Sequence, residues 1–188
     1  GTFTRFGACV DCPGGFFQAE ASQGACDACD AGQHQAANRS ASCLPCVPGK
    51  HQADIGQQTC DACAAGTFTS DSGRDTPTCT GCPPGQYQPS NGSASCLPCT
   101  PGSHQPSAGQ STCLGCTPGT YASDVGQTTP TCTLCPRGYA QPANDSASCL
   151  PCIPGEHQNS TGGARCAKCP RDSITETTAQ SDCVRCPG

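Results

Sequence analysis

The sequence contains very few of the side chains that build a hydrophobic core. It has no Met and no Trp, and Leu, Ile, Val and Phe together number 17 of its 188 residues. A chain this poor in large apolar groups cannot bury enough surface to offset the conformational entropy that it loses on folding. The sequence therefore excludes an ordinary globular core and predicts that covalent cross-links take its place.

Charged residues are also scarce, with nine Lys and Arg against 14 Asp and Glu. This acidic balance argues against nucleic-acid binding, which needs a cationic track. No apolar run is long enough to cross a bilayer, and the chain opens with no signal-peptide pattern, so we expect a mature segment without a membrane span. We also find no Ser-His-Asp arrangement and no phosphate-cradling glycine loop, so we expect no catalytic residue, no cofactor and no enzyme.

Cysteine, by contrast, is abundant and regularly spaced. The 22 Cys form eleven Cys-x-x-Cys motifs that recur every 17 residues, with two steps of 19. A fixed short period indicates one structural unit repeated head to tail, each touching mainly its neighbours. We predict one continuous array over residues 1–188, a small disulfide-rich fold shaped as an elongated solenoid-like rod. Each repeat is expected to be a hairpin with short β arms, little regular secondary structure and no helix.

The loop that follows each motif contains recurrent turn residues. The third loop residue is Gly in nine of ten loops, often after Pro as in Pro48-Gly49, and a second Gly recurs later as at Gly56. Pro followed by Gly favours a type II turn, in which Gly supplies the positive φ. The chain is therefore expected to reverse just after each second cysteine.

Two residues beyond this Gly, an aromatic ring or a His recurs in eight of the ten loops, with Ala140 and Ile174 as the exceptions. All four His lie here, and we expect the ring to cover the neighbouring disulfide and Pro. The alternative is a metal site or a pH switch, because His51, His104 and His157 are spaced by 53 residues. Phe and Tyr at the same position favour the structural interpretation, so we expect no metal.

The number of cysteines allows very many pairings, and sequence alone cannot choose among them. We favour bonds that join the second Cys of each motif to the first Cys of the next, because the length variation then falls inside closed loops. The favoured pairs, which also bound the repeat loops, are Cys12 with Cys26, Cys29 with Cys43, Cys46 with Cys60, Cys63 with Cys79, Cys82 with Cys96, Cys99 with Cys113, Cys116 with Cys132, Cys135 with Cys149, Cys152 with Cys166, and Cys169 with Cys183.

This scheme leaves Cys9 and Cys186 unpaired. They are expected to pair with cysteines outside this segment or in another copy, since both ends of the sequence fall within a repeat. The rival scheme bonds each Cys-x-x-Cys to the next in an interleaved pattern. Zinc is a further alternative, because paired motifs at this spacing resemble zinc ribbons. Disulfides at this density instead indicate an oxidising, extracellular or cell-surface location.

A longer period of 53 residues lies over the short one, made of units of 17, 17 and 19 residues. It repeats an Asn-x-Ser sequon at Asn38, Asn91 and Asn144, and a fourth sequon begins at Asn159. These four Asn are predicted sites of N-linked glycans, and the Ser and Thr are candidates for O-linked ones. The alternative is that duplication of the super-repeat copied a sequon that has no function.

The segment Cys79-Thr80-Gly81-Cys82-Pro83-Pro84-Gly85-Gln86-Tyr87 resembles the cysteine-rich, EGF-like repeats of ephrin receptors. The end of the chain, from Cys166 to Cys183, is similar to the second such repeat of those receptors. Similar units occur in tumour-necrosis-factor-receptor-like ectodomains, in protist surface antigens and in the filaments of flagellar hairs (mastigonemes). The resemblance implies an extracellular repeat array, which in the receptors serves mostly as a spacer.

Two functions from different classes remain. The first is structural: a repeat segment of an extracellular glycoprotein fibre or coat, whose partners are other copies of itself or other matrix and surface proteins. The second is the stalk or ligand-binding ectodomain of a cell-surface receptor or adhesin. A ligand site is expected to appear as a cluster of deviating residues, and the one mild cluster is Phe3, Phe6, Phe16 and Phe17.

Overall fold

The structure is a computed structural model in which residues 1–5, 8–20 and 23–187 are described. The chain forms two compact units. The first comprises Gly1–Cys82, Gln88–Cys96 and Gly109–Ser111, and the second comprises Pro83–Tyr87, Leu97–Ala108 and Thr112–Gly188. The same repeat is found in both, and we describe it within each.

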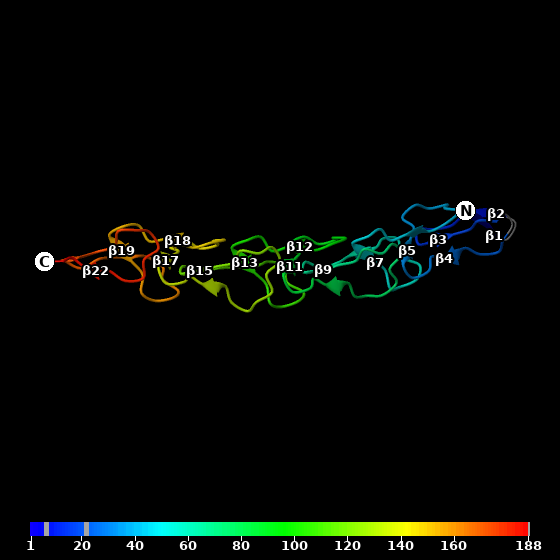
Figure 1. Ribbon diagram of the computed structural model, residues 1–188. Helices are drawn as coiled ribbons and strands as arrows, with labels where there is room; N and C mark the ends of the chain where they lie inside the picture. The colour runs from blue at the N-terminus through cyan, green and yellow to red at the C-terminus, as the bar shows by residue number, and fades with distance from the viewer. Residues whose placement is uncertain (6–7, 21–22, 188) are drawn as a thin grey trace. The chain divides into compact units, whose positions relative to one another are not determined.

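Each repeat is a minimal antiparallel hairpin, and the described residues form no helix (Figure 1). Apart from the first pair, every strand has two residues, and no pair joins another into a larger sheet within the described ranges. The pairs are β1 (Thr2–Arg5) with β2 (Ala8–Asp11), β3 (Phe16–Phe17) with β4 (Asp27–Ala28), β5 (Gln33–His34) with β6 (Leu44–Pro45), β7 (Lys50–His51) with β8 (Asp61–Ala62), β9 (Thr67–Phe68) with β10 (Thr80–Gly81), β11 (Gln86–Tyr87) with β12 (Leu97–Pro98), β13 (Ser103–His104) with β14 (Leu114–Gly115), β15 (Thr120–Tyr121) with β16 (Thr133–Leu134), β17 (Tyr139–Ala140) with β18 (Leu150–Pro151), β19 (Glu156–His157) with β20 (Ala167–Lys168), and β21 (Ser173–Ile174) with β22 (Val184–Arg185).

The expected turn after each second cysteine is present. In the third loop, the amide of Lys50 donates to the carbonyl of Val47 at 3.0 Å, and Gly49 between them has φ of 86°. Positive φ at the third position of a four-residue turn is the mark of a type II turn. Asp172, the one non-Gly residue at this position, also has positive φ, at 63°. The backbone geometry, rather than Gly itself, is therefore common to all ten loops.

The buried core consists largely of cysteine. The second cysteines from Cys12 to Cys152 are at most 2% exposed, and the only other buried hydrophobic residues in the described chain are Ala122 and Ala140. No Leu, Ile, Val or Phe of the described residues is buried. Disulfides thus take the place that large aliphatic side chains have in an ordinary domain, as the composition predicts.

Backbone hydrogen bonds link each hairpin to the next. The amide of Gly49 donates to the carbonyl of Thr69 at 2.8 Å, and the amide of Gly73 donates to the carbonyl of Cys46, also at 2.8 Å. Equivalent bonds recur along both units. Because adjacent repeats satisfy each other's amides, one repeat is an incomplete unit without its neighbour.

Backbone atoms of one repeat also approach the backbone of the second repeat along the chain, which we did not expect. A Cβ added to Gly49 would collide with the carbonyl oxygen of Gly92, which lies two loops along the chain. Within the second unit, Gly119 and Gly162 stand in the same relation. The expectation of mainly nearest-neighbour contact therefore holds for the backbone amide hydrogen bonds, whereas second neighbours meet through this glycine packing and through one ion pair in the second unit.

Candidate functional site

The disulfides are the chemical feature that every described repeat shares. The structure contains ten among its described residues, and each joins the second cysteine of one motif to the first cysteine of the next, as favoured from the sequence. They are Cys12–Cys26, Cys29–Cys43, Cys46–Cys60, Cys63–Cys79, Cys82–Cys96, Cys99–Cys113, Cys116–Cys132, Cys135–Cys149, Cys152–Cys166 and Cys169–Cys183. The two cysteines are 14 positions apart in eight bonds and 16 positions apart in the other two, Cys63–Cys79 and Cys116–Cys132.

Two cysteines of the described chain are free, Cys9 and Cys186, and both are exposed. They are the two that the favoured pairing leaves over. Their pairing with cysteines outside this segment stays a prediction.

Two of the recurrent rings, those of His34 and His157, lie against the next disulfide. His34 Nδ1 is 3.3 Å from the Sγ of Cys60 and 3.1 Å from the carbonyl oxygen of Leu44. Because that carbonyl can only accept, Nδ1 carries the proton. His157 has the same contacts, with Cys183 Sγ at 3.2 Å and the carbonyl of Ala167 at 3.1 Å. In both loops the imidazole thus lies against a sulfur of the next disulfide.

These two histidines also form the only groups of potential metal ligands in the described chain. His34 lies with Cys46 and Cys60, and His157 lies with Cys169 and Cys183. Metal binding by cysteine requires a thiolate. The four sulfurs are consumed in disulfides, so the oxidised protein offers one imidazole in each group, which is too few ligands for a zinc site.

The other two histidines have different surroundings, which weakens the idea of a shared switch. His104 is 6% exposed, and its Nδ1 is 2.9 Å from the carbonyl oxygen of Thr129. The Nδ1 of His51 is buried and has no hydrogen-bond partner. The spacing of 53 residues therefore places His51, His104 and His157 in equivalent repeats but not in equivalent environments.

All four sequon asparagines are exposed. Two of them also connect repeats, since Asn38 Oδ1 accepts from the amide of Gly14 at 2.9 Å and Asn91 Oδ1 accepts from the amide of Ala65 at 2.8 Å. The residue that corresponds to Ala65 one super-repeat later is Pro118, which has no N–H. These bonds involve the side-chain oxygen, whereas a glycan is carried by the nitrogen, so bonding and glycosylation are compatible.

Sequence reasoning missed a glutamine that directly follows the ring position. Gln88 is 7% exposed, its Nε2 donates to the carbonyl of Ser95 at 2.7 Å, and its Oε1 accepts from the amide of Ser90 at 3.1 Å. Six other loops have the same pair of bonds, made by Gln18, Gln35, Gln52, Gln105, Gln141 and Gln158. The glutamine braces the inside of the hairpin loop.

The signal that could have revealed this glutamine is its absence from the longer loops. The two loops whose cysteines are separated by 16 residues have Thr69 and Ala122 at this position. The arms of the longer loops pair in the same register, relative to the closing cysteine, as those of the shorter ones. The two added residues therefore lie in the loop tip, across which the glutamine bonds in the shorter loops. Seven of the eight shorter loops therefore have the glutamine and neither longer loop has it, while the eighth shorter loop has Thr175.

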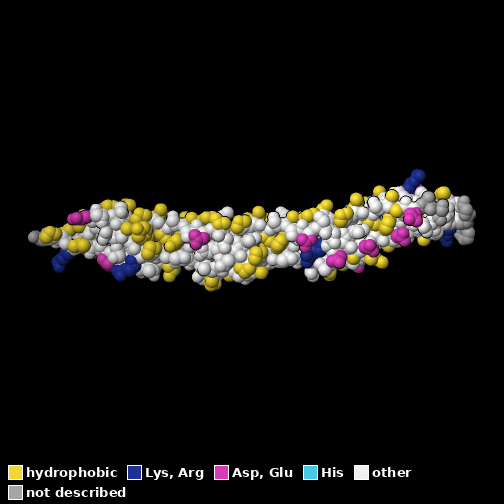
Figure 2. All heavy atoms as spheres, turned by 45° about the vertical axis from the view of Figure 1, so that its right-hand side comes forward, with side chains coloured by type: hydrophobic (Ala, Val, Ile, Leu, Met, Phe, Trp, Pro, Cys, Tyr) yellow, Lys and Arg dark blue, Asp and Glu magenta, His cyan; other side chains and the backbone are white. Residues whose placement is uncertain are grey.

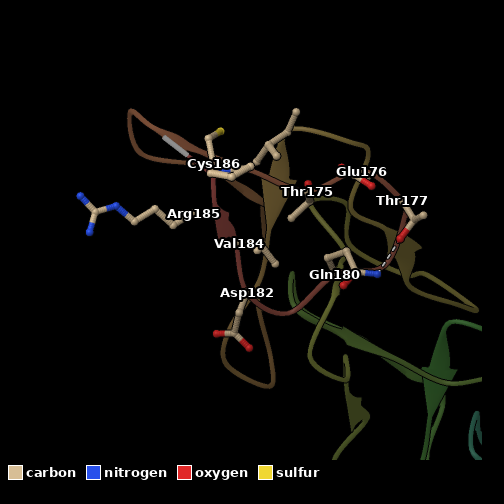
Figure 3. Close-up of a pocket in the computed structure, with 10 residues that line it drawn as sticks. Thr175, Glu176, Thr177, Gln180, Asp182, Val184, Arg185 and Cys186 are labelled. Carbon is tan, nitrogen blue, oxygen red and sulfur yellow. Dashed lines mark hydrogen bonds between the residues drawn. The ribbon is translucent and has the colours of Figure 1, made fainter.

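A hollow of about 460 Å³ lies beside Ile174, one of the two exceptions at the ring position (Figure 3). Thr175, Glu176 and Val184 line it, and Gln180 donates to the hydroxyl of Thr177 at 2.7 Å at its edge. The side chain of Arg185 extends away from these groups in Figure 3. The free cysteine Cys186 and the carboxylate residue Asp182 also line it.

The remaining surface is polar with scattered apolar groups (Figure 2). Leu44, Leu97, Leu114 and Leu150 are each about half exposed, and residues 76–123 contain no Asp, Glu, Lys or Arg. The Phe cluster considered for a ligand is not an exposed patch in its described part, because Phe3, Phe16 and Phe17 are half-buried. Phe6 lies outside the described residues.

The described residues contain no helix with the length and hydropathy that crossing a membrane requires. Comparison with curated proteins yields no match for the chain. A family described as tyrosine-protein kinase ephrin type A/B receptor-like matches residues 1–42, 34–76, 71–109 and 119–165. Its four successive matches cover well over half of the chain and follow the cysteine-rich repeats, whose disulfide content is typical of extracellular domains. The chain therefore belongs to the ephrin type A/B receptor-like family of cysteine-rich repeats.

Proposed function

We propose that this chain is a repeat segment of an extracellular structural glycoprotein that forms part of a fibre or surface coat. The observation that carries the proposal is the equivalence of its repeats: the same disulfide, turn and inter-repeat bonds recur through both units. Repeated equivalent surfaces allow repeated equivalent contacts, which a linear or helical assembly requires.

The surface chemistry supports this role. Residues 76–123 carry no Asp, Glu, Lys or Arg, so copies that pack side by side over this stretch meet no like-charge repulsion. Exposed aliphatic groups such as Leu97 and Leu114 supply apolar area for such contacts. The partner of this surface is accordingly another copy of the chain or another matrix protein.

We also propose that N-linked glycans occupy Asn38, Asn91, Asn144 and Asn159. Their exposure is the supporting observation. The first three share one place in the 53-residue super-repeat, so their sugars would limit lateral contact at regular intervals. Mass spectrometry of the native glycoprotein before and after enzymatic deglycosylation tests this, and unmodified Asn at all four sequons would contradict it.

A second candidate is the stalk of a cell-surface receptor or adhesin, favoured by the receptor-like family to which the chain belongs. Electron microscopy of native, non-reduced protein separates the two functions. Ordered filaments with an axial repeat, lost after reduction, are expected for the structural role. Isolated particles of constant length, with no lateral or end-to-end assembly, would favour the stalk.

A further inference from the structure

Two of the ten loops have no ring at the ring position, and one of these two has only an alanine there. In the loop closed by Cys135 and Cys149, the ring position holds Ala140, which is 4% exposed. A hollow of about 500 Å³ opens beside this alanine, entirely within the second unit. The methyl group of Ala140 contributes to its floor.

The position of the hollow is that of the missing ring. His34 contacts the carbonyl of a residue ten positions later and the Sγ of a cysteine 26 positions later. The residues at the same offsets from Ala140 are Leu150 and Cys166, and both line the hollow. The two residues that correspond to those contacting an imidazole elsewhere in the chain therefore both line it.

The rest of the lining suits a small aromatic group. Pro142 and Pro151 provide flat apolar walls, and Leu150 and Ile153 stand at the rim, 55% and 59% exposed. Glu156 adds one carboxylate that can accept a hydrogen bond, and Arg165 adds one guanidinium that can donate. Apolar walls with a few placed polar groups are characteristic of sites that bind small ligands or single side chains.

We propose that this hollow binds the ring of a His or Tyr side chain on a partner polypeptide. The ring lies against Pro151 and the Cys152–Cys166 disulfide, and its N–H or O–H donates to the carbonyl of Leu150, as the Nδ1–H of His34 donates to the carbonyl of Leu44. This site is independent of the proposed fibre role, since a stalk could use it equally. Such a site would allow this one repeat of the array to bind a specific partner.

The test uses the whole oxidised chain and nuclear magnetic resonance titrations with imidazole and 4-methylphenol. For fragments of this size we expect saturable binding with a Kd on the order of 1–10 mM. Shifts should concentrate at the amides of Leu150, Ile153 and Cys166. Cyclohexanol, which has an O–H but no aromatic ring, serves as the matched probe and is expected to bind at least about fivefold more weakly.

Two variants make the assignment specific. Ala140→Phe restores the residue type of the sibling loops and should abolish the shifts at Leu150. His34→Ala removes a ring and should create a second binding site, seen as new imidazole-dependent chemical-shift changes at the amides of Leu44 and Cys60. Because this variant gains binding, its result does not depend on the folding of the first.

A final titration compares the peptides Ser-Gly-Tyr-Gly-Ser and Ser-Gly-Leu-Gly-Ser. Binding of the Tyr peptide alone supports a polypeptide partner. Binding of free 4-methylphenol without binding of the Tyr peptide would restrict the hollow to small molecules and overturn the proposed partner. If cyclohexanol binds as tightly as 4-methylphenol, or if Ala140→Phe leaves the titrations unchanged, the proposal that this hollow binds a ring is wrong.

Discussion

Gly49 packs directly against the carbonyl group of Gly92, although two disulfide-closed loops separate the starts of their repeats. A Cβ at Gly49 would overlap the carbonyl oxygen of Gly92, and the φ of 86° at Gly49 is itself unfavourable for other residues. The position thus requires glycine for two reasons, one conformational and one steric.

Gly49→Ala is expected to destabilise its repeat by more than the conformational term alone. A positive φ costs an L-residue about 1–2 kcal/mol, and overpacking against the backbone adds about 1–3 kcal/mol. The amide of Cys63 donates to the carbonyl of Gly49 at 2.9 Å, so faster hydrogen exchange at Cys63 reports the effect. Denaturant unfolding of the oxidised protein provides the second measurement.

The chain provides controls for each term. Gly155 has φ of 87° and open space around an added Cβ, so Gly155→Ala should show the conformational cost alone. Gly24 has neither constraint, and Gly24→Ala should be close to neutral. If Gly49→Ala is no more harmful than Gly155→Ala, the second-neighbour packing carries no energy and our account of it is wrong.

Ala179 holds a left-handed conformation, with φ of 59°, at a position where six other loops have glycine. Ala179→Gly removes a penalty of about 1–2 kcal/mol and adds an entropic cost in the unfolded chain of about 0.5–1 kcal/mol. We expect a net gain of up to about 1.5 kcal/mol, measured as slower exchange of the residue 179 amide, which donates to the carbonyl of Cys152.

The reverse substitution serves as the control for this prediction. Gly126 has φ of 71° at the equivalent position, and its amide donates to the carbonyl of Cys99 at 2.8 Å. Gly126→Ala should therefore accelerate exchange by about the amount that Ala179→Gly slows it. A loss of stability in Ala179→Gly would show that the methyl group of Ala179 has a packing role that outweighs its backbone strain.

Gln88 is expected to hold its loop through the two hydrogen bonds to Ser90 and Ser95. Gln88→Ala leaves a part-buried carbonyl and an amide unsatisfied, at a cost of about 1–3 kcal/mol. The disulfide between Cys82 and Cys96 keeps the loop closed, so we expect local opening rather than unfolding. Faster exchange of the Ser90 amide measures it.

Ala94 lies in the same loop and is exposed, so Ala94→Ser is the control substitution and should leave the exchange of Ser90 unchanged. A stronger comparison uses the longer loop, where Thr69 replaces the glutamine. Thr69→Gln should not stabilise that loop, because the carbonyl of Thr78 before its closing cysteine already accepts from Arg74 Nε at 3.1 Å. Stabilisation there would mean that glutamine acts through burial and not through its two bonds.

The features that the sequence revealed are those set by covalent spacing and backbone preference. The cysteine period, the turn at Gly49 and the absence of helix in the described chain all follow from residue types that have few alternatives. The ring at His34 could be placed over a disulfide because Phe and Tyr substitute for His in other loops.

Two features could not be read from the same pattern. The approach of Gly49 to Gly92 depends on the rotation between successive repeats, which a period in the sequence does not specify. The hollow at Ala140 depends on which residues surround the missing ring. The brace formed by Gln88 could have been found, since glutamine recurs in seven loops and is missing from both long ones.

The pairing of the cysteines has a direct test near the end of the chain. Trypsin cleaves after Lys168, Arg171 and Arg185, and so separates peptide 169–171 from peptide 172–185. Each of these peptides contains a single cysteine, Cys169 and Cys183. The disulfide of the structure joins the two, so digestion of the unfolded, non-reduced protein should release them as one two-chain species.

The interleaved scheme predicts a different product from the same digest. If Cys166 were bonded to Cys183, peptide 172–185 would be joined to the tryptic peptide 166–168 instead. The two products differ in mass, and reduction should convert either into its components. Alkylation before digestion blocks exchange from the free thiols of Cys9 and Cys186, since a thiolate at either end could otherwise scramble the bonds. Detection of the product containing Cys166 and Cys183 would contradict the closed-loop pairing, and with it the argument that the two added residues of the longer repeats lie inside a covalent loop.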